Sequence, residues 1–531
     1  MIEELGIRIS LLLTIHSSLG ERPMNIGESL TRNAQHFPDK RAIVDAHRSV
    51  TYVELHQRTD RLANYLLELG VGQGDLVGLS VGSRAEHFEA LFAIAKIGAV
   101  AIPFDFNWSA QECDAMVRFF APKAFFIEVR KETEALLRLA RGAIPAEMLI
   151  LIADGELYDG IGMESAVELG NPSEPQTIVD GKDPFLLMIT SGTTGFPKAC
   201  SINHETYALR CLNYSVSKGM NHNERALMAL PVHFNAGRGS VMAILYLGGT
   251  IIIQEKFDAE RFLQAIEREQ ITYTMLVPVL CERLLRSEHL NKYRTTSLRF
   301  LGITGGHLSQ ELAREARQRL SPGIFEAYAS TDCGQITTVD AEDWETHGDT
   351  VGKPIWCVLL RFADNDGREV PRGEPGEICL RTPLAIQGYY RNPTATDEFL
   401  TGGWCHTGDI GFLDQEGYLH ISGRKKNMVK SGGISVFPEE IEDALRRHPA
   451  VAEVAVVGFD SQQWGEAVQA FVVLNPGANC IADELIQLCK QSLAPYKAPK
   501  AVKFVAALPR TGLGKIDRGK LAALTNQLNE N

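Results

Sequence analysis

Apolar strand-like runs alternate with helical stretches between Thr51 and Asp105, and this alternation constrains the fold most. A leucine-rich helical face ends at Gly70, a typical helix stop, and the apolar run Asp75–Val81 follows. The helical stretch Glu86–Ala99 and the apolar run Val100–Asp105 come next. A strand–helix–strand order predicts parallel strands whose faces are covered by helices.

The same alternation continues further along the chain, with apolar runs at Pro184–Thr190, Thr250–Glu255, Thr272–Pro278 and Leu298–Thr304. From Val358 the strands become shorter and turn-rich, which predicts a β-rich subdomain ending at Gly423. Residues 424–531 have their own α+β pattern. We therefore predict an α/β fold with an N-terminal extension (1–23), a large domain of helix-covered parallel sheets with the β-rich subdomain (24–423), and a small α+β C-terminal domain (424–531).

The composition excludes several classes of protein. The net charge of −13 argues against a general nucleic-acid binder, which needs a basic face. The 10 cysteines form no CxxC pair and no His/Cys cluster with zinc spacing, which favours reduced thiols in a cytoplasmic protein. No segment reaches the roughly 20 apolar residues of a membrane span.

The stretch TSGTTGFPKA, Thr190–Ala199, directly follows an apolar run. Its glycines allow several backbone N–H groups to converge on one anion, and its hydroxyls and Lys198 add further donors. This pattern predicts a phosphate-binding loop. A Walker loop requires GxxxxGK[ST], and here Pro197 precedes the lysine and Ala199 follows it, so that class is excluded. The ten residues alone leave a flexible serine- and threonine-rich turn as the alternative.

Four more motifs follow in a fixed order: YASTD (328–332), WCHTGDIG (404–411), GRKKNMVKSGGISVFPEEIE (423–442) and LPRTGLGKIDR (508–518). Together with TSGTTGFPK they resemble the adenylate-forming superfamily of acyl-CoA synthetases, peptide-synthetase adenylation domains and firefly-type luciferases. The resemblance covers the chain from about Met24 and is greatest to an acid–CoA ligase.

The resemblance implies two half-reactions. A small carboxylic acid attacks ATP with Mg²⁺ to give an acyl-adenylate and pyrophosphate, and the thiol of CoA then displaces AMP. Such catalysis depends mainly on positioning and on stabilising charge. The small C-terminal domain is expected to be mobile, rotating between the half-reactions about Lys426. A homodimer is an expectation from the family alone.

The resemblance also assigns the nucleotide site. Tyr328 stacks on adenine, Asp409 accepts the two ribose hydroxyls, and Arg424 supports the ribose or phosphate side. The remaining ATP- and AMP-binding residues are Thr190, Ser191, Gly192, Thr193, Thr194, Gly195, Lys198, Gly305 and Gly306.

Three residues are implied to be catalytic. Thr331 bonds the α-phosphate, and Lys515, on a glycine-containing loop, bridges the substrate carboxylate and that phosphate. Asp332 holds Mg²⁺ where the family usually has glutamate. Because aspartate is one methylene shorter, either the loop sits closer or a water bridges the gap. The resemblance also assigns Gly432 and Gly433 to the side of the active site where CoA binds.

The segment Leu230–Ser240 resembles the family's pocket-lining motif. It assigns His233 and Phe234, together with His307, to the acyl pocket. For Arg238 two interpretations stay open: it pairs with a second carboxylate or other polar group of the acid, or it forms a surface or structural ion pair. The acid itself, whether aliphatic, dicarboxylic or aromatic, is not specified by the sequence, and long-chain acids are less favoured.

Other functions fit less well. A stand-alone enzyme that loads the phosphopantetheine thiol of a carrier protein remains the main alternative. A luciferase-like oxygenase would need a special luciferin pocket. A non-catalytic nucleotide-binding protein would not need all the residues retained in these motifs, namely Thr193, Lys198, Asp409 and Lys515.

Overall fold

The computed structural model describes residues 25–106, 108–153, 160–190, 198–306, 308–431, 434–461, 465–494, 497–510 and 516–529. The chain divides into two compact units. Unit 1 comprises Met1–Leu359 and Arg381–Cys405, and unit 2 comprises Leu360–Leu380 and His406–Asn531. This division follows from which parts of the chain pack together. The predicted boundary at 423/424 instead separates the segment that is expected to rotate, and it stays a prediction.

Unit 1 contains two large sheets. The first has nine strands, in the order β16 (Lys353–Pro354), β15 (Gly334–Val339), β14 (Gly323–Ser330), β13 (Phe300–Ile303), β12 (Tyr273–Leu276), β10 (Arg225–Met228), β11 (Thr250–Ile253), β1 (Arg41–Val44), β2 (Ser49–Thr51). Its six middle strands, from β14 to β1, are parallel, and the strands beyond them are antiparallel.

The second sheet has eight strands, in the order β19 (Gly388–Tyr389), β9 (Lys198–Asn203), β8 (Pro184–Thr190), β4 (Val100–Pro103), β3 (Leu76–Ser80), β5 (Ala124–Glu128), β6 (Leu149–Ile152), β7 (Ile161–Gly162). Strands β8 to β7 are parallel, while β9 runs antiparallel to both β8 and β19. The predicted phosphate loop therefore connects two neighbouring antiparallel strands, β8 and β9.

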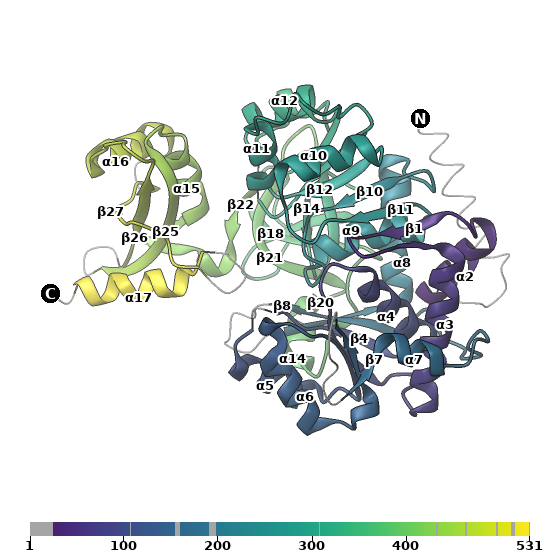
Figure 1. The fold of residues 1–531 in the computed structure, drawn as a ribbon. Coiled ribbons are helices and arrows are strands. Elements are labelled where there is room, and N and C mark those ends of the chain that lie inside the picture. Colours follow the sequence, from purple (N-terminus) through teal and green to yellow (C-terminus); the bar gives the residue numbers. More distant parts are fainter. Residues whose placement is uncertain are drawn as a thin grey trace. The chain divides into compact units, whose positions relative to one another are not determined.

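Helices cover these sheets (Figure 1): α2 (Ile26–His36), α3 (Tyr52–Glu68), α4 (Ala85–Lys96), α5 (Ala110–Phe120), α6 (Glu134–Ala143), α7 (Met163–Leu169), α8 (His204–Lys218), α9 (Asn235–Tyr246), α10 (Ala259–Arg268), α11 (Pro278–Leu285), α12 (Gln310–Arg319), α13 (Trp344–His347), α14 (Pro393–Phe399). Every residue of α4 is buried, and its charged side chains Glu86, Glu89 and Lys96 are paired with Arg84, Arg58 and Asp60. Helices α8 and α9 pack against each other, and both contact α2.

Unit 2 holds β22 (Leu419–Arg424), β23 (Val429–Ser431), β24 (Ile434–Val436), β25 (Val451–Ser461), β26 (Gly465–Leu474), β27 (Ala501–Phe504), α15 (Pro438–Arg446), α16 (Ala482–Ser492) and α17 (Arg518–Asn529). Strands β17 (Leu359–Ala363), β18 (Gly376–Arg381) and β21 (Trp404–Leu413) cross the division between units, and β20 (Leu400–Thr401) belongs to unit 1. The β25–β26 pair is antiparallel.

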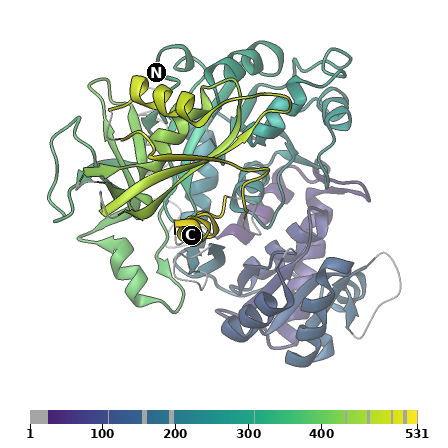
Figure 2. The same ribbon diagram turned by 90° about the vertical axis from the view of Figure 1, so that its left-hand side faces the viewer.

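Strand β25 separates two hydrophobic layers by simple alternation. Val454 and Val456 belong to the cluster under α15 and α16, whereas Ala455 and Val457 belong to the cluster with Leu521 of α17. Successive strand residues point to opposite faces, so one strand serves both layers. Figure 1 shows α15 beside the β25–β26 pair and α17 running below it, and Figure 2 views α17 along its axis.

The predicted α/β architecture, with helix-covered parallel sheets and a small α+β unit at the C-terminal side, is confirmed. The runs predicted at Asp75–Val81 and Val100–Asp105 contain β3 and β4, and Glu86–Ala99 contains most of α4. All 10 cysteines are free thiols. Among the described helices, none combines the length and apolar character needed to cross a membrane.

Candidate active site

The ends of β8 and β9 frame the predicted phosphate loop. Thr190 pairs with Lys198 across the two strands, and the Thr190 hydroxyl donates to the Lys198 carbonyl oxygen at 3.3 Å. The predicted loop residues between these strands, Ser191, Gly192, Thr193, Thr194 and Gly195, lie outside the described residues.

Tyr389 connects Lys198 to the predicted metal ligand Asp332. The Lys198 Nζ atom lies 4.9 Å from the centroid of the Tyr389 ring, and the Tyr389 hydroxyl donates to Asp332 Oδ1 at 2.7 Å. Cys200 Sγ donates to the same oxygen at 3.2 Å. Sequence analysis missed Tyr389, because β19 lies beside β9 only through a long-range antiparallel pairing of Tyr389 with Cys200.

The Asp332 carboxylate fits a role as a Mg²⁺ ligand. Oδ1 accepts both of these hydrogen bonds, while Oδ2 accepts none from the described part of the chain. A hard carboxylate oxygen is the ligand that Mg²⁺ prefers. Burial, reinforced by the Asp332 charge, raises the pKa of Tyr389, so its hydroxyl stays protonated and keeps donating. Tyr389 thus fixes the direction of the shorter acidic side chain.

Replacing Tyr389 with phenylalanine is expected to weaken activation by Mg²⁺. Loss of a hydrogen bond to a charged group typically costs about 1.5 kcal/mol or more, so we expect the half-activating Mg²⁺ concentration to rise about tenfold. The measurement is pyrophosphate release against Mg²⁺ concentration at saturating ATP. Tyr390→Phe, the neighbouring ring stacked on Phe120, is the matched control. An unchanged Mg²⁺ dependence would contradict a positioning role for Tyr389.

A cavity of about 210 Å³ lies beside Thr331 in unit 1. Its walls come from α8, α9 and the ends of β12–β14, and they include Tyr207, Arg210, Tyr214, Ser240, Met275 and Thr331. The flanking residues of Tyr328, Ala327 and Ala329, line it as well, whereas Tyr328 does not. The role of Tyr328 in stacking on adenine therefore stays a prediction.

Thr304, next to Gly305, also lines this cavity, and Gly305 has the left-handed backbone (φ 78°) that favours glycine. Gly305 and Gly306 therefore belong to a turn at the cavity's edge. The neighbouring His307, predicted for the acyl pocket, lies outside the described residues.

The other predicted acyl-pocket residues do not line this cavity. Arg238 is fully buried, donates from Nη1 to the Val232 carbonyl at 3.0 Å and contacts the Met188 sulfur. Neither the substrate-facing role nor the predicted ion pair matches these contacts, which are those of a core side chain.

His233 lies against the side chain of Asp105, with Nε2 at 3.6 Å from its carboxylate, and packs edge-on to Phe106. Burial lowers the pKa of His233, although Asp105 opposes the effect. Phe234 precedes α9 as its N-cap residue and stacks at a tilt on His233. The acyl-pocket assignment of His233 and Phe234 therefore stays a prediction.

In unit 2, Asp409 and Arg424 face each other across the antiparallel β21–β22 pair. Arg424 Nε donates to Asp409 Oδ1 at 2.8 Å, and the Asp409 carboxylate is buried while Arg424 is half exposed. The Asp409 N–H donates to the Thr407 hydroxyl at 3.0 Å. Arg424 therefore orients the carboxylate that is predicted to accept the ribose hydroxyls.

The predicted hinge residue Lys426 lies in the short 3₁₀ helix Lys425–Asn427. Lys515, Gly432 and Gly433 lie outside the described residues. The chain around Lys515 is nevertheless anchored on both sides. Before it, Arg510 forms a β-bridge with Ile516, and after it, Arg518 donates to the Val456 carbonyl and to Glu442.

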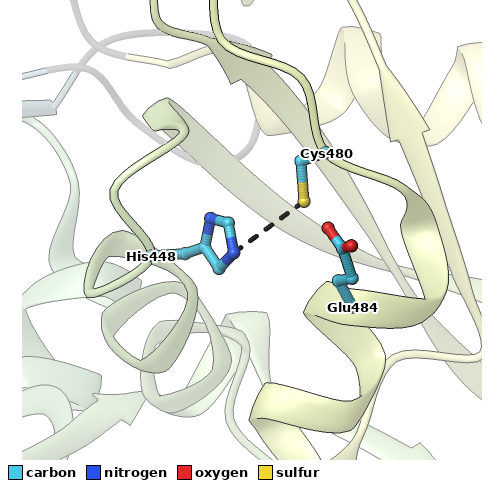
Figure 3. A group of neighbouring side chains, drawn as sticks. All are labelled: His448, Cys480 and Glu484. Carbon is cyan, nitrogen blue, oxygen red and sulfur yellow. Dashed lines mark hydrogen bonds between the residues drawn. The ribbon is translucent and has the colours of Figure 1, made fainter.

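His448, Cys480 and Glu484 form a group in unit 2 whose ligand atoms lie within 4.8 Å of one another (Figure 3). His448 Nδ1 accepts from the Ala450 N–H at 3.2 Å, so a neutral ring carries its proton on Nε2, the nitrogen facing Cys480. Glu484 accepts from the Ile481 N–H at the start of α16. These bonds describe a helix cap and leave no imidazole lone pair for a metal.

Comparison with known proteins identifies the family. The family model "AMP-binding enzyme" matches residues 30–390, and "AMP-binding enzyme C-terminal domain" matches residues 440–515. The indoleacetate–CoA ligase of Aromatoleum aromaticum is 33% identical over 94% of this chain and 98% of its own length. A feruloyl-CoA synthase of Amycolatopsis is 32% identical over 94% of this chain and 99% of its own.

Among solved structures, the amide bond synthetase McbA from Marinactinospora thermotolerans superposes with a TM-score of 0.84. It is 26% identical, and the match covers 94% of this chain and 99% of that one. The first family model covers the motifs at 190–199 and 328–332, and the second covers most of the motif at 508–518. The chain therefore belongs to the AMP-binding enzyme family, the adenylate-forming enzymes that its five ordered motifs indicated.

Proposed function

We propose that this enzyme is an ATP-dependent acid–CoA ligase. It activates a carboxylic acid as acyl-AMP with release of pyrophosphate and then transfers the acyl group to the thiol of CoA. The observation that carries the proposal is the cavity of about 210 Å³ beside Thr331, next in sequence to the oriented carboxylate of Asp332. An acid in that cavity has its carboxylate beside the residue predicted to bond the α-phosphate.

The residue roles follow from the chemistry. Asp332 would hold Mg²⁺, which would supply charge neutralisation at the phosphates of ATP. Thr331 orients the α-phosphate by hydrogen bonding, and Asp409 with Arg424 holds the ribose. Lys515 brings a positive charge between the two anions that must react, which offsets their repulsion.

The cavity favours a compact acid. Pockets for drug-sized ligands typically have volumes of about 300–1,000 Å³, so about 210 Å³ corresponds to a short or single-ring acid. Similarity to an indoleacetate–CoA ligase and a feruloyl-CoA synthase supports an aryl or arylalkyl acid over a long aliphatic chain.

A panel of acids tests this proposal. The enzyme is incubated with ATP, Mg²⁺ and short aliphatic, dicarboxylic, aromatic or long-chain acids, with and without CoA, and products are identified by mass. We expect pyrophosphate and acyl-CoA with compact acids, and at least tenfold lower kcat/KM with long-chain acids. Absence of acid-dependent pyrophosphate across the whole panel would contradict the proposal.

A second candidate is an adenylating enzyme with a different acceptor, such as a carrier-protein thiol. The similarity to an amide bond synthetase supports this candidate, because it indicates that adenylate-forming enzymes of this fold transfer the acyl group to more than one kind of acceptor. In the same experiment, acyl-AMP that accumulates in the presence of CoA supports this candidate. Acyl-CoA formation at a rate matching pyrophosphate release excludes it.

A further inference from the structure

Two polar side chains on one face of α8 end in buried donors that lack an acceptor. Tyr207 and Arg210 are three positions apart, which places them on the same side of the helix, and both line the cavity beside Thr331. Within the described residues, Arg210 Nη1 has no hydrogen-bond partner. The Tyr207 hydroxyl lies beside the Arg238 guanidinium, which can only donate to it, so the hydroxyl proton has no acceptor. Buried polar atoms without partners are uncommon in folded proteins and call for a specific explanation.

The rest of the Arg210 guanidinium is firmly held. Nε donates to the Leu384 carbonyl oxygen at 2.9 Å, and Nη2 donates to the Thr331 carbonyl oxygen at 3.0 Å. These two bonds fix the plane of the group and leave Nη1 as its spare donor. Because the anchors are backbone oxygens, the position of Nη1 is set before any ligand enters.

The electrostatics of the pair suit an anionic oxygen. Burial raises the pKa of Tyr207 to about 12, against the opposing charge and hydrogen bond of Arg238 and the charge of Arg210, so its hydroxyl remains a donor. Burial lowers the pKa of Arg210, with Cys200, Cys333, Tyr207 and Asp332 opposing, and a guanidinium nevertheless stays protonated in proteins. A fixed cation and a hydroxyl donor on one wall attract an oxygen with negative charge.

We propose that Tyr207 and Arg210 recognise a second carboxylate on the compact acid that this enzyme activates. The inference rests on the proposed function and specifies its substrate as a dicarboxylic acid, most simply one built on a single ring. The second carboxylate satisfies both spare donors, while the reacting carboxylate lies at the side chain of Thr331. The sequence assigned such a role to Arg238, whose guanidinium is instead bonded within the core.

Matched, non-hydrolysable acyl-sulfamoyl adenosines test the inference by binding alone. The set comprises the benzoyl compound and its three carboxybenzoyl isomers, and affinities are measured by calorimetry. We expect the wild-type enzyme to prefer the best carboxybenzoyl isomer about 30-fold, since hydrogen bonds to charged groups contribute at this level. The inference is overturned if none of the three isomers binds more tightly than the benzoyl compound.

Two variants assign the preference to the pair. Tyr207→Phe removes only a hydroxyl and is expected to lower the preference about fivefold, and Arg210→Lys keeps the charge and part of the preference. Tyr65→Phe removes a hydroxyl that donates to the Glu147 carbonyl away from the cavity, and it leaves the preference unchanged. Equal loss of affinity for benzoyl and carboxybenzoyl compounds in both α8 variants also overturns the inference, because a structural or reaction-centre role has that effect.

The outcome also separates this inference from the proposed function. If the adenosines bind and the acid panel yields pyrophosphate but no preference for a second carboxylate appears, only the inference fails. If no analogue binds and no acid gives pyrophosphate, the proposed function fails with it.

Discussion

Lys515→Ala is expected to reduce acid-dependent pyrophosphate release about 100- to 1,000-fold while leaving thioester formation from supplied acyl-adenylate largely intact. In the first half-reaction a carboxylate must approach the negatively charged α-phosphate, so a bridging ammonium stabilises the transition state directly. In the second half-reaction the phosphate leaves with AMP, and a neutral thioester forms. The two half-reactions are measured separately, by pyrophosphate release and by acyl-CoA formation from the isolated adenylate.

Lys520→Ala is the matched control for this variant. Lys520 lies five residues later on α17, and its side chain is mostly exposed, with Nζ 3.5 Å from Asp517. Removing it deletes the same charge from the same unit, and we expect both half-reactions to stay within about twofold of the wild type. Equal loss of both half-reactions in Lys515→Ala, with the fold intact, would mean that this lysine has another role.

The fold was predictable where local patterns and long-range structure agree. The apolar runs containing β3 and β4 and the helix α4 between them have lengths and periodicities that tertiary packing did not alter. Other features depend on pairings that no local pattern specifies. The bulge between Tyr328 and Ala329 arises only when β14 meets β15, and β19 pairs with β9 across almost 190 residues.

The site was predicted less completely, and α9 shows why. The motif pointed to the segment that begins this helix, and Asn235, Ala236, Gly239 and Ser240 of the helix line the cavity. These positions share one helical face, and Arg238 falls on another face, among core residues. A motif identifies the element near a ligand, whereas the rotation of the helix decides which of its side chains faces that ligand.

The cavity wall on α8 carried no motif at all. Tyr207 and Arg210 lie in a stretch without a recognisable pattern, and their importance follows only from the donors left without an acceptor after folding. The sequence shows that Tyr207 and Arg210 are three residues apart, but many pairs of residues on helices have this spacing. Only burial distinguishes such a pair from an ordinary exposed helix face.

Arg518→Met is expected to lower the free energy of opening of the C-terminal α+β layer by about 3 kcal/mol, because it breaks a buried ion pair. Arg518 donates to Glu442 Oε2 at 2.9 Å and to the Val456 carbonyl at 2.6 Å. Glu442 is only 2% exposed and also accepts from the Val456 N–H at 2.7 Å. Without Arg518, this carboxylate keeps the half-exposed Arg446 as a charged partner but loses the guanidinium that is buried beside it, so most of the compensation of its charge is lost.

The measurement is hydrogen exchange of the Val456 amide, which reports on this layer even though the whole chain does not unfold in one step. A loss of about 3 kcal/mol corresponds to exchange more than about 100-fold faster. Arg510→Met is the control, because its pair with Glu453, at 2.7 Å, is half exposed on both sides. Such a surface pair contributes less than about 1 kcal/mol, so exchange should change less than about fivefold.

The same variant connects stability to catalysis. Arg518 follows Lys515 by three residues, and its bonds to Glu442 and Val456 fix where the chain leaves the loop that carries the lysine. Small displacements of a catalytic group have large effects on rate, so we expect adenylation to slow at least about tenfold in Arg518→Met at a temperature where the unit stays folded. Unchanged exchange together with slowed adenylation would assign Arg518 to the reaction itself, whereas faster exchange with full activity would show that the loop needs no anchor at this end.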